Sequence, residues 1–407
     1  MKLLLSKACI AGAALALSLG VAAGSLHAEE KKPFVIGAIF SKTGAYAGVG
    51  GLLEAALTTA VNEVNEKGGI LGRPVKIEVR DDGSNPGRAL LAARELVGDG
   101  KIDVMYPDAI SGLVLAILPY TSSEKIITVT NAGAPAVGDA TKFPYSFQYG
   151  DTANARADAL AVAIKKDGGK KVGILVNTNP AIIATADEFE KQAKALGMEV
   201  VGYEKFGAEV KDLSAQLQSL RAAGADRLFF GGPAQNNLRV AMVGLQTLNW
   251  KVPLFTDLSS ITNLNMATEL PETTHDQLHV LTVAAATRVN GKVDPQVGQF
   301  VTRLDNKRAL DPAAVNTRDV VYLMKWAYET AQAKSGNTNP DTVRAVLEKA
   351  GTPGYELKDI LIYKHPNYTT ERHTTSEADY THVWGLMGVN EAKDGMYAST
   401  PFVADAK

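Results

Sequence analysis

The sequence has little cysteine and no excess of charge of either sign. Its one cysteine among 407 residues is Cys9, so no disulfide within the chain can stabilise the fold, and no thiol lies beyond that residue. Lysine and arginine number 42 against 44 aspartate and glutamate residues. Without a basic excess to displace counterions from a phosphate backbone, nucleic-acid binding is not expected. The 46% hydrophobic content is instead typical of a chain with large buried cores.

Several signatures of cofactor and catalytic sites are also missing. The sequence contains no phosphate-binding loop, no zinc-binding helix motif and no nucleophile elbow. Glycines at 48, 50 and 51 follow the first predicted strand, but they lack the full spacing of a dinucleotide-binding loop. We therefore expect no cofactor.

Paired residues that resemble metal or catalytic sites have simpler interpretations. His275 and His279 have the i,i+4 spacing of a helical metal site, but their segment follows Pro271 and is predicted to be a loop. We interpret both as surface histidines. Asp81 and Asp82 directly follow a predicted strand, where aspartate side chains commonly cap backbone amides. We therefore expect neither a metal site nor enzyme activity.

The first 28 residues have the pattern of a secretory signal peptide. Two lysines precede an apolar stretch over residues 8–23, and small residues lead to Ala28, which four charged residues follow. The alternative is an N-terminal membrane anchor, which the short apolar stretch disfavours. No later segment is apolar over a length sufficient to cross a bilayer. We expect export and cleavage after Ala28, and a mature protein that is soluble.

The remaining chain alternates predicted strands and helices in two successive series. The first series predicts strands over 34–40, 75–79, 102–106 and 126–130, with helices over 53–65, 88–97 and 112–123. The second predicts helices over 152–166, 184–196, 213–223 and 236–248, with strands over 171–176, 199–203, 227–230 and 252–255. Such alternation indicates parallel sheets with right-handed crossovers. The sequence thus predicts two α/β lobes of similar architecture.

Three segments are candidates for crossing between the lobes: residues 143–149, 280–285 and 353–362. A long helix is predicted over 317–333 and would return to the first lobe. The polar segment from His365 to Tyr380 is predicted to be a surface loop before a last strand over 382–389.

Small polar residues follow the carboxyl ends of the predicted strands, where open α/β sheets bind ligands. These segments are 41–46, 108–112 and 130–133 in the first series, and 177–180, 231–234 and 257–260 in the second. Backbone amides in glycine-rich loops and at helix N-termini suit a carboxylate. Ser111 is predicted to cap the helix that it precedes, and either also to bind ligand or to cap alone.

Four stretches carry a resemblance to a known family: residues 36–48, 60–74, 80–86 and 128–135. Over about residues 33–400, the chain resembles the branched-chain amino-acid (Leu/Ile/Val) binding family, the periplasmic receptors of ABC importers. The resemblance implies a type I periplasmic-binding-protein fold, in which three crossover strands join two Rossmann-like lobes that close over a ligand. It also implies a monomer in the periplasm, and two partners: a small-molecule ligand and a membrane permease.

The resemblance also implies lobe boundaries and a set of binding residues. Lobe 1 would comprise 33–147 and 286–352, and lobe 2 would comprise 148–285 and 353–400. Asn131 and Gly133 fall where amino-acid receptors use a backbone carbonyl and a threonine hydroxyl, so Gly133 lacks one carboxylate donor. The full set of candidate ligand-binding residues is Ala45, Tyr46, Ser111, Gly112, Asn131, Ala132, Gly133, Ile182, Pro233, Ala234, Asp257 and Ser259.

The expected ligand follows from the acidic residues near the site. In the family an acidic residue near Ser259 would pair with a ligand ammonium, and here only Asp257 is close. Because a buried unpaired charge costs several kcal/mol, a small carboxylate with an apolar or aromatic body is the first expectation. Branched-chain or other amino acids, and amides or urea, are the alternatives. Different classes of function are a sensory ligand-binding module and an exported enzyme that uses Asp81, Asp82 or Asp257.

Overall fold

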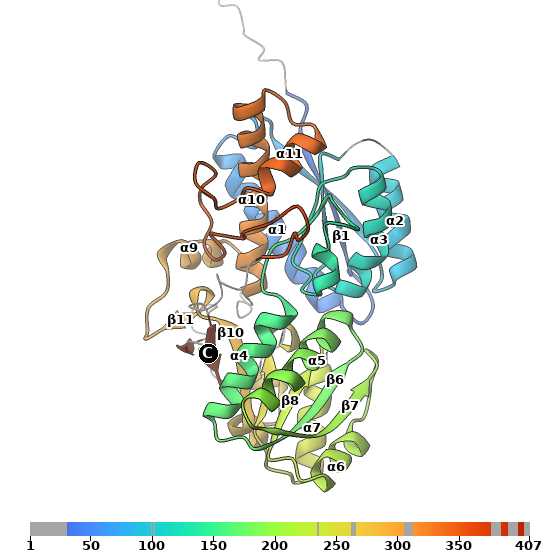
Figure 1. Cartoon of the computed structure of the whole chain (residues 1–407), viewed down its shortest axis with the longest axis vertical. Helices are drawn as coiled ribbons and strands as arrows, with labels where there is room; N and C mark the ends of the chain where they lie inside the picture. The colour runs from blue at the N-terminus through green and yellow to red at the C-terminus, as the bar shows by residue number, and fades with distance from the viewer. Residues whose placement is uncertain are drawn as a thin grey trace, which may run out of the picture.

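The computed structural model contains two α/β lobes, one above the other in Figure 1. The predicted signal peptide (residues 1–28), which includes Cys9, and Ala234 lie outside the residues that the structure describes. Within those residues, no helix combines the length and the apolar character needed to cross a bilayer. The described residues are 31–98, 100, 102–233, 236–261, 266–304, 312–375, 384–389 and 398–402.

The first lobe is built on a five-stranded sheet. Its strands are β1 (Phe34–Phe40), β2 (Val75–Asp81), β3 (Val104–Pro107), β4 (Thr128–Thr130) and β5 (Ser146–Gln148). They lie in the order β2-β1-β3-β4-β5, and all neighbours are parallel. All seven residues of β1 are buried, as expected for a continuous apolar run covered on both faces.

Helices from both halves of the sequence cover this sheet. The early ones are α1 (Ala47–Glu66), α2 (Pro86–Gly98) and α3 (Ser111–Ser123), and the late ones are α9 (Pro295–Arg303), α10 (Pro312–Ser335) and α11 (Pro340–Leu347). α10 packs along α1, and the ring of Tyr328 on α10 meets Phe34 of β1 edge-on at 4.9 Å. The long helix predicted from the sequence therefore does return to the first lobe (Figure 1).

The second lobe is built on a larger, mixed sheet. Its order is β11-β13-β12-β10-β9-β8-β6-β7; β12 is antiparallel to β10 and β13, and the other pairs are parallel. Four of its helices are α4 (Ala153–Lys166), α5 (Pro180–Ala195), α6 (Ser214–Ala222) and α7 (Asn237–Thr247), and α8 (Met266–Glu269) is a single turn. The strands are β6 (Lys171–Asn177), β7 (Glu199–Phe206), β8 (Arg227–Gly231), β9 (Leu254–Asp257), β10 (Leu278–Val283), β11 (Arg288–Val289), β12 (Trp384–Met387) and β13 (Ala398–Pro401).

Several helices start earlier than the sequence pattern predicts, and the reason is clear for α1 and α5. α1 begins at Ala47 rather than at 53, because its glycines allow the helix to pass close to the β1 loop: a Cβ on Gly50 would lie 2.2 Å from the carbonyl oxygen of Ser41. α5 begins at Pro180 rather than at 184, since proline suits the first helical position and Asn179 accepts the Ala181 amide as its cap.

The segment after residue 362 differs from its predicted surface loop. His373 is fully buried and stacks on Phe147 of β5 at 4.0 Å, and the hydroxyl of Tyr368 donates to the carbonyl of Gln148. Residues 363–375 therefore pack on the first sheet, although residues 353–400 were expected in lobe 2. Of that range, the strands β12 and β13 do pair in the second sheet. Residues 376–380 lie outside the described part.

Candidate ligand site between the lobes

A cavity lies between the two sheets, at the carboxyl ends of their parallel strands. It encloses about 870 Å³ of empty space, part of it open to solvent. Segments that follow β3, β4, β6, β8 and β9 contribute to its wall. The residues that line it are Val49, Ala109, Ile110, Asn131, Gly133, Asp151, Arg156, Asn179, Ala181, Ile182, Pro233, Asp257, Leu258, Ser259, Leu281, Val283, Ala313, Asn316, Ile362, Tyr363 and Trp384.

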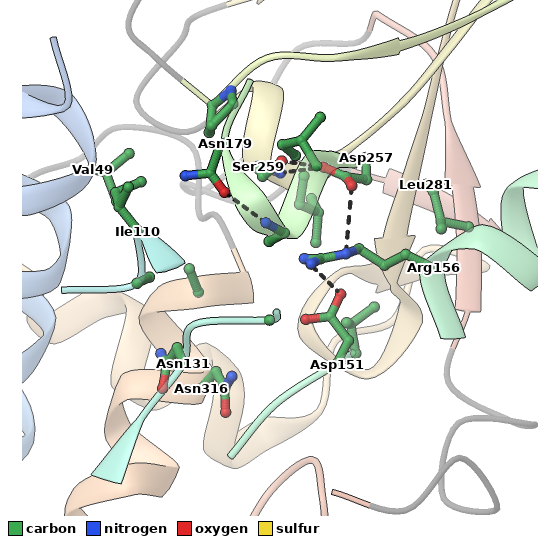
Figure 2. Close-up of a pocket in the computed structure, with 18 of the residues that line it drawn as sticks. Val49, Ile110, Asn131, Asp151, Arg156, Asn179, Asp257, Ser259, Leu281 and Asn316 are labelled. Carbon is green, nitrogen blue, oxygen red and sulfur yellow. Dashed lines mark hydrogen bonds and ion pairs between the residues drawn. The ribbon is translucent and has the colours of Figure 1, made fainter. Parts of the chain in front are cut away.

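Most of the wall is apolar, and it comes from both lobes. Val49 and Ile110 face it from the first lobe, and Ile182, Leu281 and Trp384 face it from the second (Figure 2 labels Val49, Ile110 and Leu281). Because burial of apolar surface contributes about 25 cal/mol per Å², such walls favour a ligand with an apolar body.

A charged cluster lies at one end of the cavity (Figure 2). Arg156, on the first turn of α4, has its Nη1 3.5 Å from Oδ2 of Asp151 and its Nε 3.6 Å from Oδ2 of Asp257. Asp257 also accepts hydrogen bonds from the backbone amide and the hydroxyl of Ser259. The pKa of the Asp151 carboxyl is raised, because the effect of burial exceeds the opposing effect of the nearby Arg156 charge. The cavity therefore carries two carboxylates and one guanidinium among the residues described.

Two asparagines on the first-lobe side offer carbonyl oxygens. Asn316 donates its amide to the carbonyl of Tyr149 at 3.2 Å, which fixes the orientation of its side chain. The side-chain amide of Asn131 donates to the Thr317 hydroxyl at 3.4 Å, and that hydroxyl donates to the backbone carbonyl of Ala313. Within the described residues, neither Asn131 Oδ1 nor Asn316 Oδ1 accepts a hydrogen bond. Both oxygens are therefore buried acceptors that lack a donor.

The predicted site residues divide into two groups. Asn131, Gly133, Ile182, Pro233, Asp257 and Ser259 line the cavity. Ala45, Tyr46, Ser111, Gly112 and Ala132 do not line it.

Three of the residues outside the lining lie where the lobes touch. A Cβ on Gly112 would meet Cδ of Pro180, across the lobe boundary, at 3.6 Å. The pKa of the Tyr46 hydroxyl is raised, chiefly by burial, and a side-chain hydrogen bond with Asn179 of the other lobe opposes this shift. Ala132 belongs to an apolar cluster of the first lobe that Ala181 of α5 joins. These residues therefore lie against the other lobe on one side of the cavity.

Ser111 was predicted to cap a helix, and this prediction is wrong. It is the first residue of α3, whose cap is Ile110, and its hydroxyl accepts the backbone amide of Ala134 at 3.1 Å. Asp108 fixes the start of the helix instead, because its Oδ1 accepts the Ile110 amide at 2.9 Å. Ser111 is fully buried.

We expect Ser111→Ala to affect stability more than ligand binding. The variant leaves the amide of Ala134 without its acceptor, which costs about 1–3 kcal/mol of unfolding free energy. Urea unfolding and a ligand titration of the same variant measure the two effects separately. A large loss of affinity with unchanged stability would instead assign the hydroxyl to the ligand.

Other polar residues singled out in the sequence have structural roles. Asp81 accepts the amides of Lys42 and Gly83, as the capping interpretation predicted. His279 was predicted to lie in a loop, but it lies in β10 and stacks on Phe255 at 4.5 Å. No cluster of three or more metal-ligating side chains occurs among the described residues.

Asp82 and Asp108 form a buried acidic pair beneath the cavity wall. The hydroxyl of Ser41 donates to Asp82 at 2.7 Å, and the amide of Ser41 donates to Asp108 at 3.0 Å. Burial raises the pKa of Asp108 to about 7, and the charge of Asp82 adds to this shift. The pKa of Asp82 is also raised by burial.

This pair predicts a pH dependence of stability. Because the folded pKa of Asp108 lies above its unfolded value, folding takes up a proton between about pH 4 and 7. The unfolding free energy should therefore fall as the pH rises through this window and level off above it. We expect Asp108→Asn to reduce this slope, while Asp82 and Asp319, whose pKa values are also raised by burial, leave a residual slope. Urea unfolding from pH 5 to 8 measures it, and equal slopes in both proteins would contradict the assignment.

The lining residues that the sequence reasoning missed include four polar or aromatic ones: Asp151, Arg156, Asn316 and Trp384. Arg156 lies on a helix instead of following a strand, and a single arginine within the alanine-rich run of α4 is the only signal that marks it. Asn316 and Trp384 come from late segments whose place beside the cavity depends on the chain crossing between lobes.

Comparisons with known proteins agree with this architecture. The "Leu/Ile/Val-binding protein homolog 3" of Brucella melitensis is 30% identical over 201 residues, which are 48% of this chain and 54% of that protein. The chain thus spans about half the length of the curated relatives it matches.

Two solved structures share the fold of the whole chain. A "fatty acid ABC transporter substrate-binding protein" from Thermomonospora curvata aligns with a TM-score of 0.76 and 19% identity, covering 92% of this chain and 93% of that one. A solute-binding protein of an ABC transporter from Rhodopseudomonas palustris BisB5, in complex with 3,4-dihydroxybenzoic acid, aligns with a TM-score of 0.66 and 19% identity. The alignment covers 77% of this chain and 84% of that one. These likenesses confirm the predicted type I fold.

A family model described as "Periplasmic binding protein" matches residues 33–384. The members of this family are solute-binding receptors of ABC transporters. The match covers both sheets up to the start of β12 and every residue that lines the cavity. The chain therefore belongs to the periplasmic binding protein family.

Proposed function

We propose that the protein is an exported receptor that binds a small carboxylate with an apolar body and delivers it to an ABC importer permease. The observation that carries this proposal is the cavity between the lobes, which combines apolar walls with a buried guanidinium. Among the described residues that line it, Arg156 is the one lysine or arginine. Arginine matches the planar geometry of a carboxylate, with which it forms paired hydrogen bonds.

The remaining parts of the proposal follow from the family and the sequence. Residues 1–28 would direct export to the periplasm and be removed there. The receptor would act as a monomer, without a cofactor and without catalysis, and ligand would be held by closure of the lobes. The candidate residues in contact with it are those that line the cavity, Asn131, Gly133, Asp257 and Ser259 among them.

A second candidate ligand is an α-amino acid with an apolar side chain. Asp257 reaches the cavity, so an ammonium would find a carboxylate partner there. Its Oδ2 accepts no hydrogen bond from the described residues, and among those residues the one cation that forms an ion pair with it is Arg156, at 3.6 Å. The two carboxylates and the one guanidinium of the cavity leave one negative charge in excess, which the ammonium of an amino acid would balance. The Brucella relative whose name includes Leu/Ile/Val supports the same ligand class.

A thermal-shift panel on purified residues 29–407 tests the proposal. It contains leucine, valine, benzoate- and cinnamate-type acids, short aliphatic acids, and urea or amides. A ligand at about 100 times its Kd adds about 2.7 kcal/mol of stability, which raises the melting temperature measurably. A shift with acids that lack an ammonium supports the first candidate, and a shift with leucine or valine supports the second. No shift with any compound, or turnover of one, contradicts the receptor proposal.

A further inference from the structure

Gly133 and Arg156 occupy the same small space beside the cavity. A Cβ placed on Gly133 would lie 2.3 Å from Nη2 of Arg156 and 3.2 Å from its Cζ. Real Cβ atoms do not approach other heavy atoms so closely, so the guanidinium lies where any side chain at position 133 would begin. The next neighbour, the backbone carbonyl of Asp151, is 3.3 Å away and needs to yield only slightly.

The two residues come from different lobes. Gly133 follows β4 of the first lobe, whereas Arg156 lies on α4, which packs on α5 and β9 of the second. The backbone amide of Ala153, at the start of α4, donates to the carbonyl of Gly133 at 3.1 Å. This hydrogen bond fixes the start of α4 against Gly133, and the guanidinium extends from there into the cavity. The absence of a side chain at Gly133 is therefore what allows Arg156 to reach across the lobe boundary.

Two carboxylates contact the guanidinium: Asp151, in the segment between β5 and α4, and Asp257, at the end of β9. Asp151 and Asp257 contact it at 3.5 and 3.6 Å through different nitrogens, and Figure 2 shows Arg156 extended between them. A side chain at position 133 would displace the guanidinium from this position beside Gly133. The cavity would then offer a ligand carboxylate two negative charges and no cation placed to meet it.

We propose that Gly133 and Arg156 together set the charge specificity of the receptor. Because Gly133 has no side chain, the guanidinium can occupy the space beside it, and there it binds the ligand carboxylate. This inference rests on the proposed function and names the residues that distinguish a carboxylate from its uncharged analogue. Gly133 is a positioning residue, since it acts through Arg156, and Arg156 is the residue in contact with the ligand.

Matched acids and amides test the inference. The probes are phenylacetate with phenylacetamide, 4-methylpentanoate with 4-methylpentanamide, and leucine with leucinamide. Calorimetric titration measures the affinity of each pair for the wild type, Gly133→Ala and Arg156→Gln. Gly51→Ala is the matched control, because its new Cβ would meet nothing within 4 Å.

We expect the wild type to prefer the acid of at least one pair. In Gly133→Ala and Arg156→Gln the acid should bind about 10- to 100-fold more weakly, the loss of a hydrogen bond to a charged group, while the amide changes little. Gly51→Ala should retain the preference. Gly133→Ala displaces the end of a flexible side chain and requires only a slight shift of the Asp151 carbonyl, so it tests the inference even if Arg156→Gln does not fold.

Three results would overturn the inference. An acid preference that survives in Gly133→Ala would show that Gly133 does not position the guanidinium. An equal loss of acid and amide affinity would show a purely structural role. Binding of none of the probes to the folded wild type would contradict the proposed function and this inference with it, whereas the first two results leave the proposed function intact.

Discussion

Replacing Asp319 with alanine is expected to lower the unfolding free energy by about 3–5 kcal/mol, the cost of breaking a buried ion pair. Asp319 is fully buried on α10 and accepts the amides of Leu361 and Ile362 at 2.8–3.0 Å. It also contacts Nη1 of Arg318 at 3.3 Å. The variant removes the acceptor of two backbone amides and one of the partners of a buried guanidinium.

The same change should also weaken ligand binding, because Ile362 lines the cavity and Asp319 fixes the backbone there. Urea unfolding and the thermal-shift panel measure the two effects. Asp276→Ala, at an exposed position, is the control and should change stability by less than about 0.5 kcal/mol. Equal stability of the two variants would show that the 360–363 segment is held by its apolar contacts alone.

Two adjacent glycines of α1 should respond in opposite directions to alanine. A Cβ on Gly50 would lie 2.2 Å from the Ser41 carbonyl oxygen. Because that oxygen belongs to the backbone, the clash cannot be relieved by rotation of a side chain. Gly50→Ala should therefore destabilise the protein toward the upper end of the 1–3 kcal/mol that overpacking typically costs, about 3 kcal/mol. Because Val49 lines the cavity, the shifted helix should also reduce ligand affinity.

Gly51 is the matched control for Gly50. Its Cβ would meet nothing within 4 Å, and the residue is exposed in the helix. Gly51→Ala should raise the unfolding free energy by about 0.5–1 kcal/mol, the difference between glycine and alanine in a helix interior. Chemical unfolding of the two variants makes the comparison. A loss of stability in Gly51→Ala as large as in Gly50→Ala would mean that the first turn of α1 is not helical.

The strands were readable from sequence because burial on both faces requires continuous apolar runs. β1, β6 and β8 all coincide with such runs. The burial of Tyr368 and His373 was not readable, since it depends on contacts with β5 about 220 residues away. Local polarity therefore predicted a surface loop where long-range packing buries aromatic rings.

The site was predictable only as far as strand topology determines it. The carboxyl ends of parallel strands marked Asn131 in one lobe and Asp257 and Ser259 in the other as candidates, and the family resemblance implied that both lobes close over one ligand. Arg156 was missed because it lies within a helix, and its approach to the cavity depends on the missing side chain of Gly133 in the other lobe. Such a contact follows from how the lobes meet, which no local pattern describes.

The division of each lobe between early and late sequence determines when the protein can finish folding. Synthesis releases the N-terminus first, yet the first lobe needs α10 and α11, and the second sheet needs β12 and β13 beside β10. Until those last strands emerge, β10 presents an open edge that another chain can pair with. Contacts so distant in sequence form slowly. The two lobes therefore complete late and nearly together, and a chain cut short before residue 384 would expose that edge permanently.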